Sequence, residues 1–167
     1  MKSECFKTVG EEVAKVVLRQ LVRAVAYLHG GEIVHRDLKL ENVLVSREMK
    51  IKLIDFGFSR RLPKENYVLY DFCGTPHYIA PEVIQREGYY GKPADIWSLG
   101  VLLYRMVAGS FPFKGLNEKN IYSKVMKAEL KLPNDLSPEL SSLLTDMLSF
   151  DFRKRPTAEE LLSSRWL

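Results

Sequence analysis

The sequence predicts a mainly α-helical domain with a short β-hairpin, in which an α-helical bundle surrounds a buried central helix. Three observations predict this fold class. Several segments carry apolar residues at spacings of three and four, which is typical of amphipathic helices. The segment after Pro93 is apolar on nearly every side, as expected for a helix inside a core. Two β-like runs, 43–45 and 51–54, flank a polar turn and favour a hairpin.

The first helix is expected to begin near Thr8, because Thr8 and Glu11 have the spacing of a capping box. It should end at Gly30 and Gly31, since glycine accepts the left-handed turn that often follows a helix. Between these ends, helical spacing predicts one buried stripe made of Val13, Val17, Leu21, Ala24 and Leu28.

The central helix should begin after Pro93, and amphipathic helices are expected at 117–127, 138–149 and 158–165. The second of these has Ser137 as its N-cap, and the third opens with a capping box of Thr157 and Glu160. No regular period is sustained between the hairpin and the central helix, and so long an irregular stretch is usually functional. We find no repeat or linker and expect one domain over 1–167.

Composition narrows the class of protein. The chain has 167 residues, 46% of them hydrophobic and 28% charged, which suits a globular domain that buries roughly 70% of its unfolded surface. No stretch predicts a membrane span or a signal peptide. With only Cys5 and Cys73, neither a disulfide framework nor a thiolate zinc site is expected, so a cytoplasmic or possibly nuclear location is predicted. The net charge of +4 selects neither phosphate nor nucleic acid as a ligand.

Two polar clusters flank the hairpin, at 35–42 and 55–57, and the hairpin should bring them together. Phosphoryl transfer from a nucleotide needs a carboxylate that accepts the proton of the attacking hydroxyl, and oxygen ligands for magnesium. Asp37, Asn42 and Asp55 supply these groups. The alternative is a set of turn-forming residues on a solvated loop, but the order and spacing of the clusters favour the catalytic interpretation.

Lys39 lies two residues after Asp37 and can place a cation on the transferring phosphate, where negative charge must be neutralised. Together with the clusters above, the chain resembles the eukaryotic protein kinase family. The resemblance makes 35–42 the catalytic loop and 55–57 the metal-binding Asp-Phe-Gly, and 55–82 becomes the activation segment, which Ala-Pro-Glu closes.

The resemblance implies a protein-kinase-like large lobe, the C-terminal lobe of a kinase domain, over 1–167, without the small lobe. It also implies serine/threonine kinase activity with ATP and Mg²⁺, with Asp37 as the base and Lys39 on the γ-phosphate. Leu44 would form the floor of the adenine pocket. The residues expected to bind the nucleotide are Lys39, Glu41, Asn42, Leu44 and Asp55, of which Asn42 and Asp55 would hold the metal.

Lys39 and the sequence Gly-Thr-Pro at 74–76 are similar to the serine/threonine branch of the family. In that branch Thr75 would join the catalytic residues by hydrogen bonding near Asp37 and Lys39; the alternative is a plain turn threonine. The stretch 72–82 looks most like the calcium/calmodulin-dependent and AMP-activated kinase group. Proteins with serine or threonine hydroxyls are therefore the expected substrates, and a small-lobe or regulatory protein is a possible further partner.

Four residues are expected to regulate the segment. Many such kinases carry a phosphorylatable threonine where this chain has Asp71, whose charge near −1 compares with roughly −1.5 to −2 for a phosphate. Arg36 is its natural partner, so we expect an activation segment ordered in part without an upstream kinase. The alternative is a solvated aspartate at a loop tip. Arg155 resembles the arginine that pairs with Glu82 of the Ala-Pro-Glu motif.

Glu41 occupies a place that helps basophilic relatives recognise arginine or lysine in a substrate. Arg105 stands where several of those relatives place a second acid. It should repel a basic substrate residue by up to about 1 kcal/mol at a solvated site. Arg105 therefore argues against basophilic specificity.

A kinase also needs a glycine-rich loop and a strand lysine. Gly10, Gly30 and Gly31 do not form that loop, and Glu11 with Lys15 has the spacing of an ordinary surface pair. The alternative function is therefore a catalytically incompetent lone lobe that acts as a protein-binding or regulatory module. Nucleic-acid binding is not expected, because no aromatic and basic stripe is present.

Overall fold

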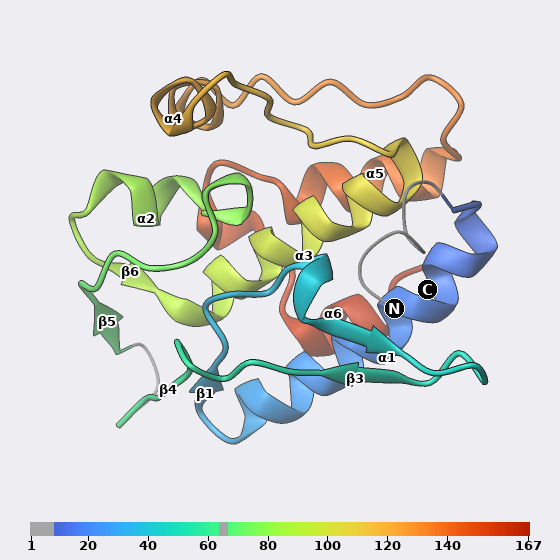
Figure 1. The fold of residues 1–167 in the computed structure, drawn as a ribbon, viewed down its shortest axis with the longest axis horizontal. Coiled ribbons are helices and arrows are strands. Elements are labelled where there is room, and N and C mark those ends of the chain that lie inside the picture. Colours follow the sequence, from blue (N-terminus) through green and yellow to red (C-terminus); the bar gives the residue numbers. More distant parts are fainter. Residues whose placement is uncertain (1–8, 64–66) are drawn as a thin grey trace.

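The computed structural model describes residues 9–63 and 67–167, and these form a mainly helical fold with short strands (Figure 1). Cys5 and the predicted cap Thr8 lie outside the described residues. The helices are α1 (Glu11–Gly30), α2 (Pro81–Gln85), α3 (Gly91–Ala108), α4 (Glu118–Met126), α5 (Pro138–Met147) and α6 (Ala158–Leu162). Short 3₁₀ turns are η2 (Leu40–Asn42), η3 (Pro76–Tyr78) and η4 (Phe152–Lys154).

The strands pair in antiparallel couples that hold the polar segments in place. Strand β2 (Val43–Val45) pairs with β3 (Ile51–Leu53), which confirms the predicted hairpin. Strand β1 (Ile33–Val34) pairs with β4 (Arg60–Arg61), and β5 (Val68–Leu69) pairs with β6 (Tyr89–Tyr90). The β1–β4 pair ties the segment 55–91 to the chain before it, and the β5–β6 pair joins two parts of that segment to each other.

Helix α1 begins at Glu11 with Gly10 as its N-cap, and no side chain caps it. Glu11 instead accepts hydrogen bonds from Ser137 and from the indole of Trp166, so the predicted role of Glu11 in a capping box is wrong. The predicted surface pair with Lys15 is also wrong, because Lys15 pairs with Glu12 at 3.1 Å. The Glu11 carboxylate therefore links the start of α1 to the last residues of the chain.

The buried face of α1 is rotated from the predicted stripe. Val17 and Leu21 are fully buried as predicted, but Val13 is 41% exposed, and Ala14 and Leu18 are fully buried in addition. The helix ends at Gly30 as predicted, but Gly31 has φ of −88°, and the left-handed residue is Glu32 with φ of 56°. The expected end is thus confirmed and the reason given for it is wrong.

Helix α3 runs through the centre of the molecule (Figure 1) and is buried on every side, as predicted. Trp97 is fully buried and stacks on Phe113, with 5.7 Å between the ring centroids. Helices α1 and α5 pack against α3, and α6 packs against α1. Because α3 carries the residues that hold the polar loops, the core and the site are built on one element.

The later helices begin where their caps predict. Asn117, Ser137 and Thr157 each accept a backbone hydrogen bond at a helix start, and Thr157 with Glu160 completes the capping box. Helix α6 ends at Leu162, three residues before the predicted end at 165. Within the described parts of the chain, no helix is both long and apolar enough to cross a membrane.

Candidate active site

The polar loop between β1 and η2 is fixed to the central helix by one buried carboxylate. Asp95, the fifth residue of α3, accepts hydrogen bonds from the backbone amides of His35 and Arg36, both at 2.9 Å. Its Oδ2 also lies 3.0 Å from Nε2 of His29. Arg36 has φ of 67°, a left-handed conformation that a non-glycine residue rarely adopts. Asp95 therefore holds a sharp turn immediately before Asp37.

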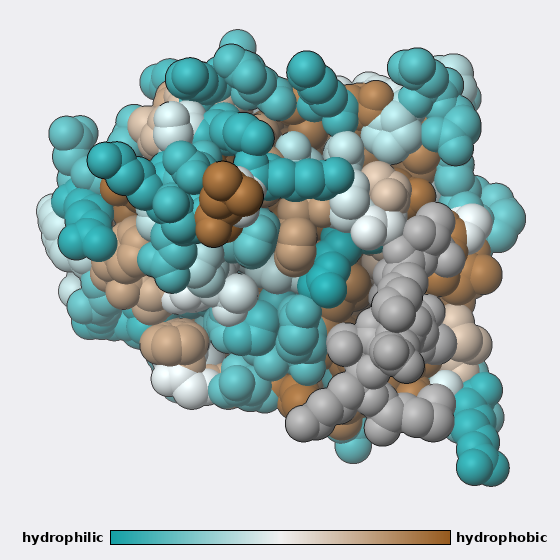
Figure 2. Space-filling view, turned by 45° about the horizontal axis from the view of Figure 1, so that its top comes forward, coloured by the Kyte–Doolittle hydropathy of each residue, from teal (hydrophilic) through white to brown (hydrophobic). Residues whose placement is uncertain are grey.

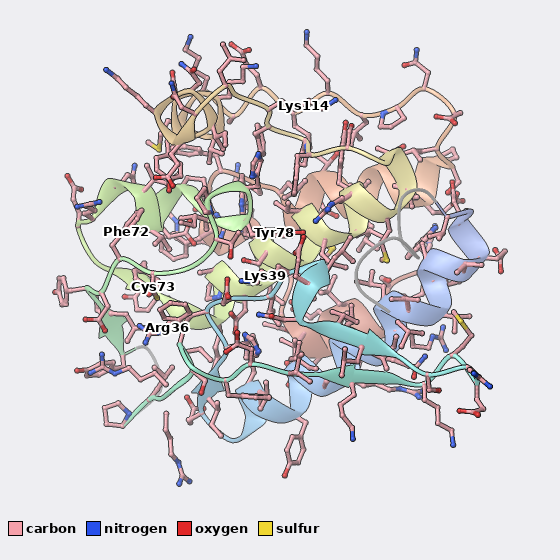
Figure 3. All side chains as sticks on the ribbon, viewed as in Figure 1. Arg36, Lys39, Phe72, Cys73, Tyr78 and Lys114 are labelled. Carbon is pink, nitrogen blue, oxygen red and sulfur yellow. The ribbon has the colours of Figure 1, made fainter. Side chains whose placement is uncertain are left out.

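Asp37, Lys39 and Thr75 form a closed triangle of hydrogen bonds. The ammonium of Lys39 donates to Oδ2 of Asp37 at 2.6 Å and to the hydroxyl of Thr75 at 2.9 Å. That hydroxyl donates to Oδ1 of Asp37 at 2.8 Å. The predicted contacts of Thr75 are therefore present. The triangle fixes both carboxylate oxygens, while the Lys39 side chain stays 20% exposed at its rim (Figure 3).

Asn42 ends η2 and is also tied to Asp37. Its amide nitrogen donates to the Asp37 carbonyl at 2.9 Å and to Oδ2 at 3.3 Å. Its backbone carbonyl accepts from the amide of Ile54 at 3.0 Å. The hairpin thus brings the segment before Asp55 to Asn42, as the sequence predicts.

Asp55 follows β3 with φ of 62°, and its exposed carboxylate accepts a 3.3 Å hydrogen bond from the amide of Gly57. Among the described residues, no group of three or more His, Cys, Asp or Glu side chains could hold a metal ion. A cation here would rest on carboxylate and amide oxygens from Asp55 and Asn42, which are ligands that Mg²⁺ accepts. In the described chain, Oδ1 of Asn42 makes no hydrogen bond that would compete.

Glu41 and Leu44 lie on either side of Asn42. Leu44, on β2, is 48% exposed. The carboxylate of Glu41 pairs with Arg105 at 2.7 Å, and that guanidinium also donates to the Tyr78 hydroxyl at 2.8 Å. Burial raises the pKa of Glu41, but the hydrogen bond from Arg105, a backbone hydrogen bond and the charges of Arg105 and Lys39 together outweigh it, and the net pKa is lowered. The two residues that the sequence treats as separate specificity features therefore neutralise each other.

Asp71 is gripped by two arginines. The guanidinium of Arg36 lies 3.3 Å from Oδ2 of Asp71, and that of Arg60 lies 2.6 Å from the same oxygen. The predicted contact with Arg36 is present, although a single oxygen makes it. The sequence did not predict the contact of Arg60 with Asp71. The pairing of β1 with β4 explains it, because it sets Arg60 opposite Val34, near Arg36.

Glu82 and Arg155 form a buried, bidentate ion pair, with nitrogen to oxygen distances of 2.7 and 2.8 Å. The Arg155 side chain is fully buried and that of Glu82 is 7% exposed. Arg155 also donates to the carbonyl of Pro93 and lies over the ring of Trp97, 4.9 Å from its centroid. The pair fastens the start of α2 to α3 and η4.

A family model described as Protein kinase domain matches residues 3–167. The chain belongs to the protein kinase family. The sequence-based prediction of a eukaryotic protein kinase of the serine/threonine branch is confirmed by its relatives.

Two relatives of this kinase-family chain carry informative names. It is similar to maternal embryonic leucine zipper kinase of Xenopus laevis, with 45% identity over 159 residues, 94% of this chain and 24% of the relative. It is also similar to CBL-interacting serine/threonine-protein kinase 15 of Arabidopsis thaliana, with 42% identity over 158 residues, 93% of this chain and 38% of the relative. The chain thus spans well under half the length of either.

Proposed function

We propose that this chain supplies the catalytic residues of a serine/threonine protein kinase, which transfers the γ-phosphate of ATP to serine or threonine hydroxyls of proteins. The observation that carries the proposal is the triangle of Asp37, Lys39 and Thr75. A scaffold has no chemical need for a buried carboxylate whose two oxygens are both oriented by donors. Phosphoryl transfer needs that orientation, because catalysis there is mostly positioning and charge stabilisation.

Asp37 acts as the base. Its side chain is 2% exposed, and its position is fixed through Lys39 and Thr75, so it can meet the hydroxyl of a bound substrate in one orientation. It accepts the proton of that hydroxyl as the oxygen attacks phosphorus. Positioned bases contribute typically about 10²- to 10⁴-fold to a rate.

Lys39 supports the negative charge of the transferring group, since its ammonium has three donors and the triangle uses two of them. Asn42 and Asp55 offer amide and carboxylate oxygens for magnesium, and Leu44 offers an apolar side chain for the adenine ring. Bound Mg²⁺ would neutralise charge on the phosphates of ATP.

The chain is the large, C-terminal lobe of a kinase domain over 1–167, with the catalytic loop at 35–42 and the activation segment at 55–82. Its mainly helical architecture supports this. The exposed apolar side chains beside the hairpin also support it, because Leu44, Phe56 and Phe58 are 45 to 48% exposed and suit a covering protein surface. The same surface favours one alternative function, a non-catalytic module that binds a partner there.

The test is magnesium-dependent phosphate transfer from ATP to a protein substrate by the natural polypeptide that carries this chain. Asp37→Asn and Asp55→Asn should each abolish transfer while circular dichroism shows an unchanged fold. Asp151→Asn, which changes a half-buried aspartate that pairs with Arg153, is the matched control and should remain active. Transfer that survives both site substitutions would overturn the proposal, and partner binding without nucleotide affinity would favour the alternative.

A further inference from the structure

Helix α4 borders two hollows on the surface, of about 460 and 260 Å³. The first lies between α4 and the segment after α3, and the second lies between that segment and the chain that follows α4 (Figure 1). Lys114 and Lys124 line both hollows, so the two are continuous. Figure 2 shows hydrophilic side chains over much of this face, with hydrophobic ones between them.

The hollows carry an excess of positive charge. Their charged side chains at neutral pH are Lys114, Lys124, Lys127, Lys131 and a single acid, Glu129. All four lysines are exposed, and none of them forms an ion pair with another described residue. We call these four residues the lysine groove. Unpaired cations that converge on a hollow attract an anionic ligand.

Part of the groove wall is apolar. Phe111 and Pro112 line the second hollow beside Tyr104, and Leu116, at the edge of the first hollow, is completely exposed. A large apolar side chain that is fully exposed beside unpaired cations suits contact with a side chain of similar character. A ligand that fits the groove therefore combines negative charge with at least one apolar group.

The inner end of the groove reaches the proposed active site. Phe111 stacks on His77, with 4.0 Å between the ring centroids, and His77 follows Thr75 by two residues. The guanidinium of Arg105 lies 4.6 Å from the Phe111 ring and is the group that neutralises Glu41. Tyr78, which binds the same guanidinium, lies between Lys39 and Lys114 in the view of Figure 3. One extended peptide segment can therefore contact both the lysine groove and the proposed active site.

We propose that the lysine groove docks an acidic segment of the protein substrate that also carries an apolar residue. This rests on the proposed kinase function and names the class of substrate. An acidic protein segment fits better than a nucleic acid or a membrane. A protein segment can place an uncharged residue opposite Glu129, whereas a phosphodiester chain carries a negative charge at every unit. A pair of hollows with an aromatic side chain in the wall accepts side chains rather than a flat lipid surface.

Binding is tested without phosphate transfer, with a fluorescent peptide of alternating acidic residues around one central leucine. Loss of one exposed charge contact weakens binding by about 1.4- to 5-fold. Reversal of two charges, in Lys114→Glu with Lys124→Glu, should therefore raise the dissociation constant by about tenfold or more. Added salt should weaken the wild-type complex and have less effect on that variant.

The matched control is Lys50→Glu with Lys154→Glu, which makes the same change in net charge with exposed lysines that lie outside α4 and line neither hollow. It should leave peptide binding within about twofold, since distant surface charges are screened. Equal weakening by both variants would overturn the proposal, because net charge alone would then explain binding. Groove-dependent capture of an oligonucleotide or an anionic phosphatidylserine vesicle in place of the peptide would also overturn it.

A second measurement separates this proposal from the kinase proposal. In phosphate transfer, the groove variant should raise KM for a substrate with an acidic segment and leave both kcat and KM for ATP unchanged. KM for a substrate without that segment should not change. If no transfer occurs but the peptide binds through the groove, the kinase proposal fails and the docking surface stands. If transfer occurs with no effect of the groove on KM, the docking proposal fails alone.

Discussion

Glu82→Gln should destabilise the fold strongly, because it removes the charge that compensates a completely buried guanidinium. Arg155 has no exposed side-chain surface, and its two terminal nitrogens both bind Glu82. Removing one partner of a buried ion pair typically costs about 3–5 kcal/mol. Arg155 keeps its bonds to the carbonyls of Ser149 and Pro93, at 2.9 and 3.0 Å, so we expect the low end, about 3 kcal/mol.

The assay is urea unfolding followed by tryptophan fluorescence, since Trp97 lies directly beneath the guanidinium. With a urea dependence of roughly 1–3 kcal/mol per M, the midpoint should fall by about 1–3 M. Domains of this size are stable by about 5–15 kcal/mol, so the loss is a large fraction of the total. Phosphate transfer should fall as well, because Glu82 fastens the end of the proposed activation segment.

Two further variants test whether the unpaired buried charge causes the loss of stability. Glu82→Leu with Arg155→Met removes both charges and should recover much of the lost stability, because no buried charge is left unpaired. Asp151→Asn breaks an exposed pair with Arg153 and should move the midpoint little. A Glu82→Gln midpoint as close to wild type as that of Asp151→Asn would refute the argument.

Three other predictions follow from single contacts. Thr75→Val keeps the shape of the side chain but removes the hydroxyl of the triangle, so kcat should fall by about tenfold or more with KM for ATP unchanged, and Thr75→Ser should restore it. Burial raises the pKa of Tyr78 to about 12 from 10.0, so stability should be lost between these pH values, and Tyr78→Phe should remove one late-titrating group from the ultraviolet tyrosine titration. Because the pKa of Glu41 is lowered, its ionised form contributes stability that is present above pH 4.5 and lost as pH falls through the lowered value. Arg105→Ala should therefore make the melting temperature fall less steeply with decreasing pH in the acid range.

Local signals predicted most of the helices, because a cap depends on a few neighbouring residues. Ser137 and Thr157 bond the amides three residues ahead, which can be seen in the sequence. The buried face of α1 was harder, since apolar residues occupy Val13, Ala14 and several later positions and so allow more than one stripe. Only the neighbours α3 and α6 decide which stripe is buried.

Contacts between distant residues were largely outside the reach of sequence reasoning. Glu11 binds Trp166, which is 155 positions away, and no periodicity links the two. The sequence suggested opposite effects of Glu41 and Arg105 on a basic substrate residue. Their 2.7 Å ion pair instead makes them one neutral unit. Family resemblance found the carboxylates and the lysine of the site, whereas the second arginine on Asp71 depended on a strand pairing of only two residues.

The central helix does more than fill the core. Arg36 and Asp55 both hold left-handed conformations, and such backbone costs about 1–3 kcal/mol each unless its surroundings determine it. For Arg36 the fixed surroundings come from Asp95, which is 1% exposed and accepts hydrogen bonds from the backbone amides of His35 and Arg36. A carboxylate inside a buried, mainly apolar helix would be costly without these donors. The burial of α3 and the strained turn before Asp37 therefore stabilise each other, so the position of the proposed base depends on a residue that lies in the core.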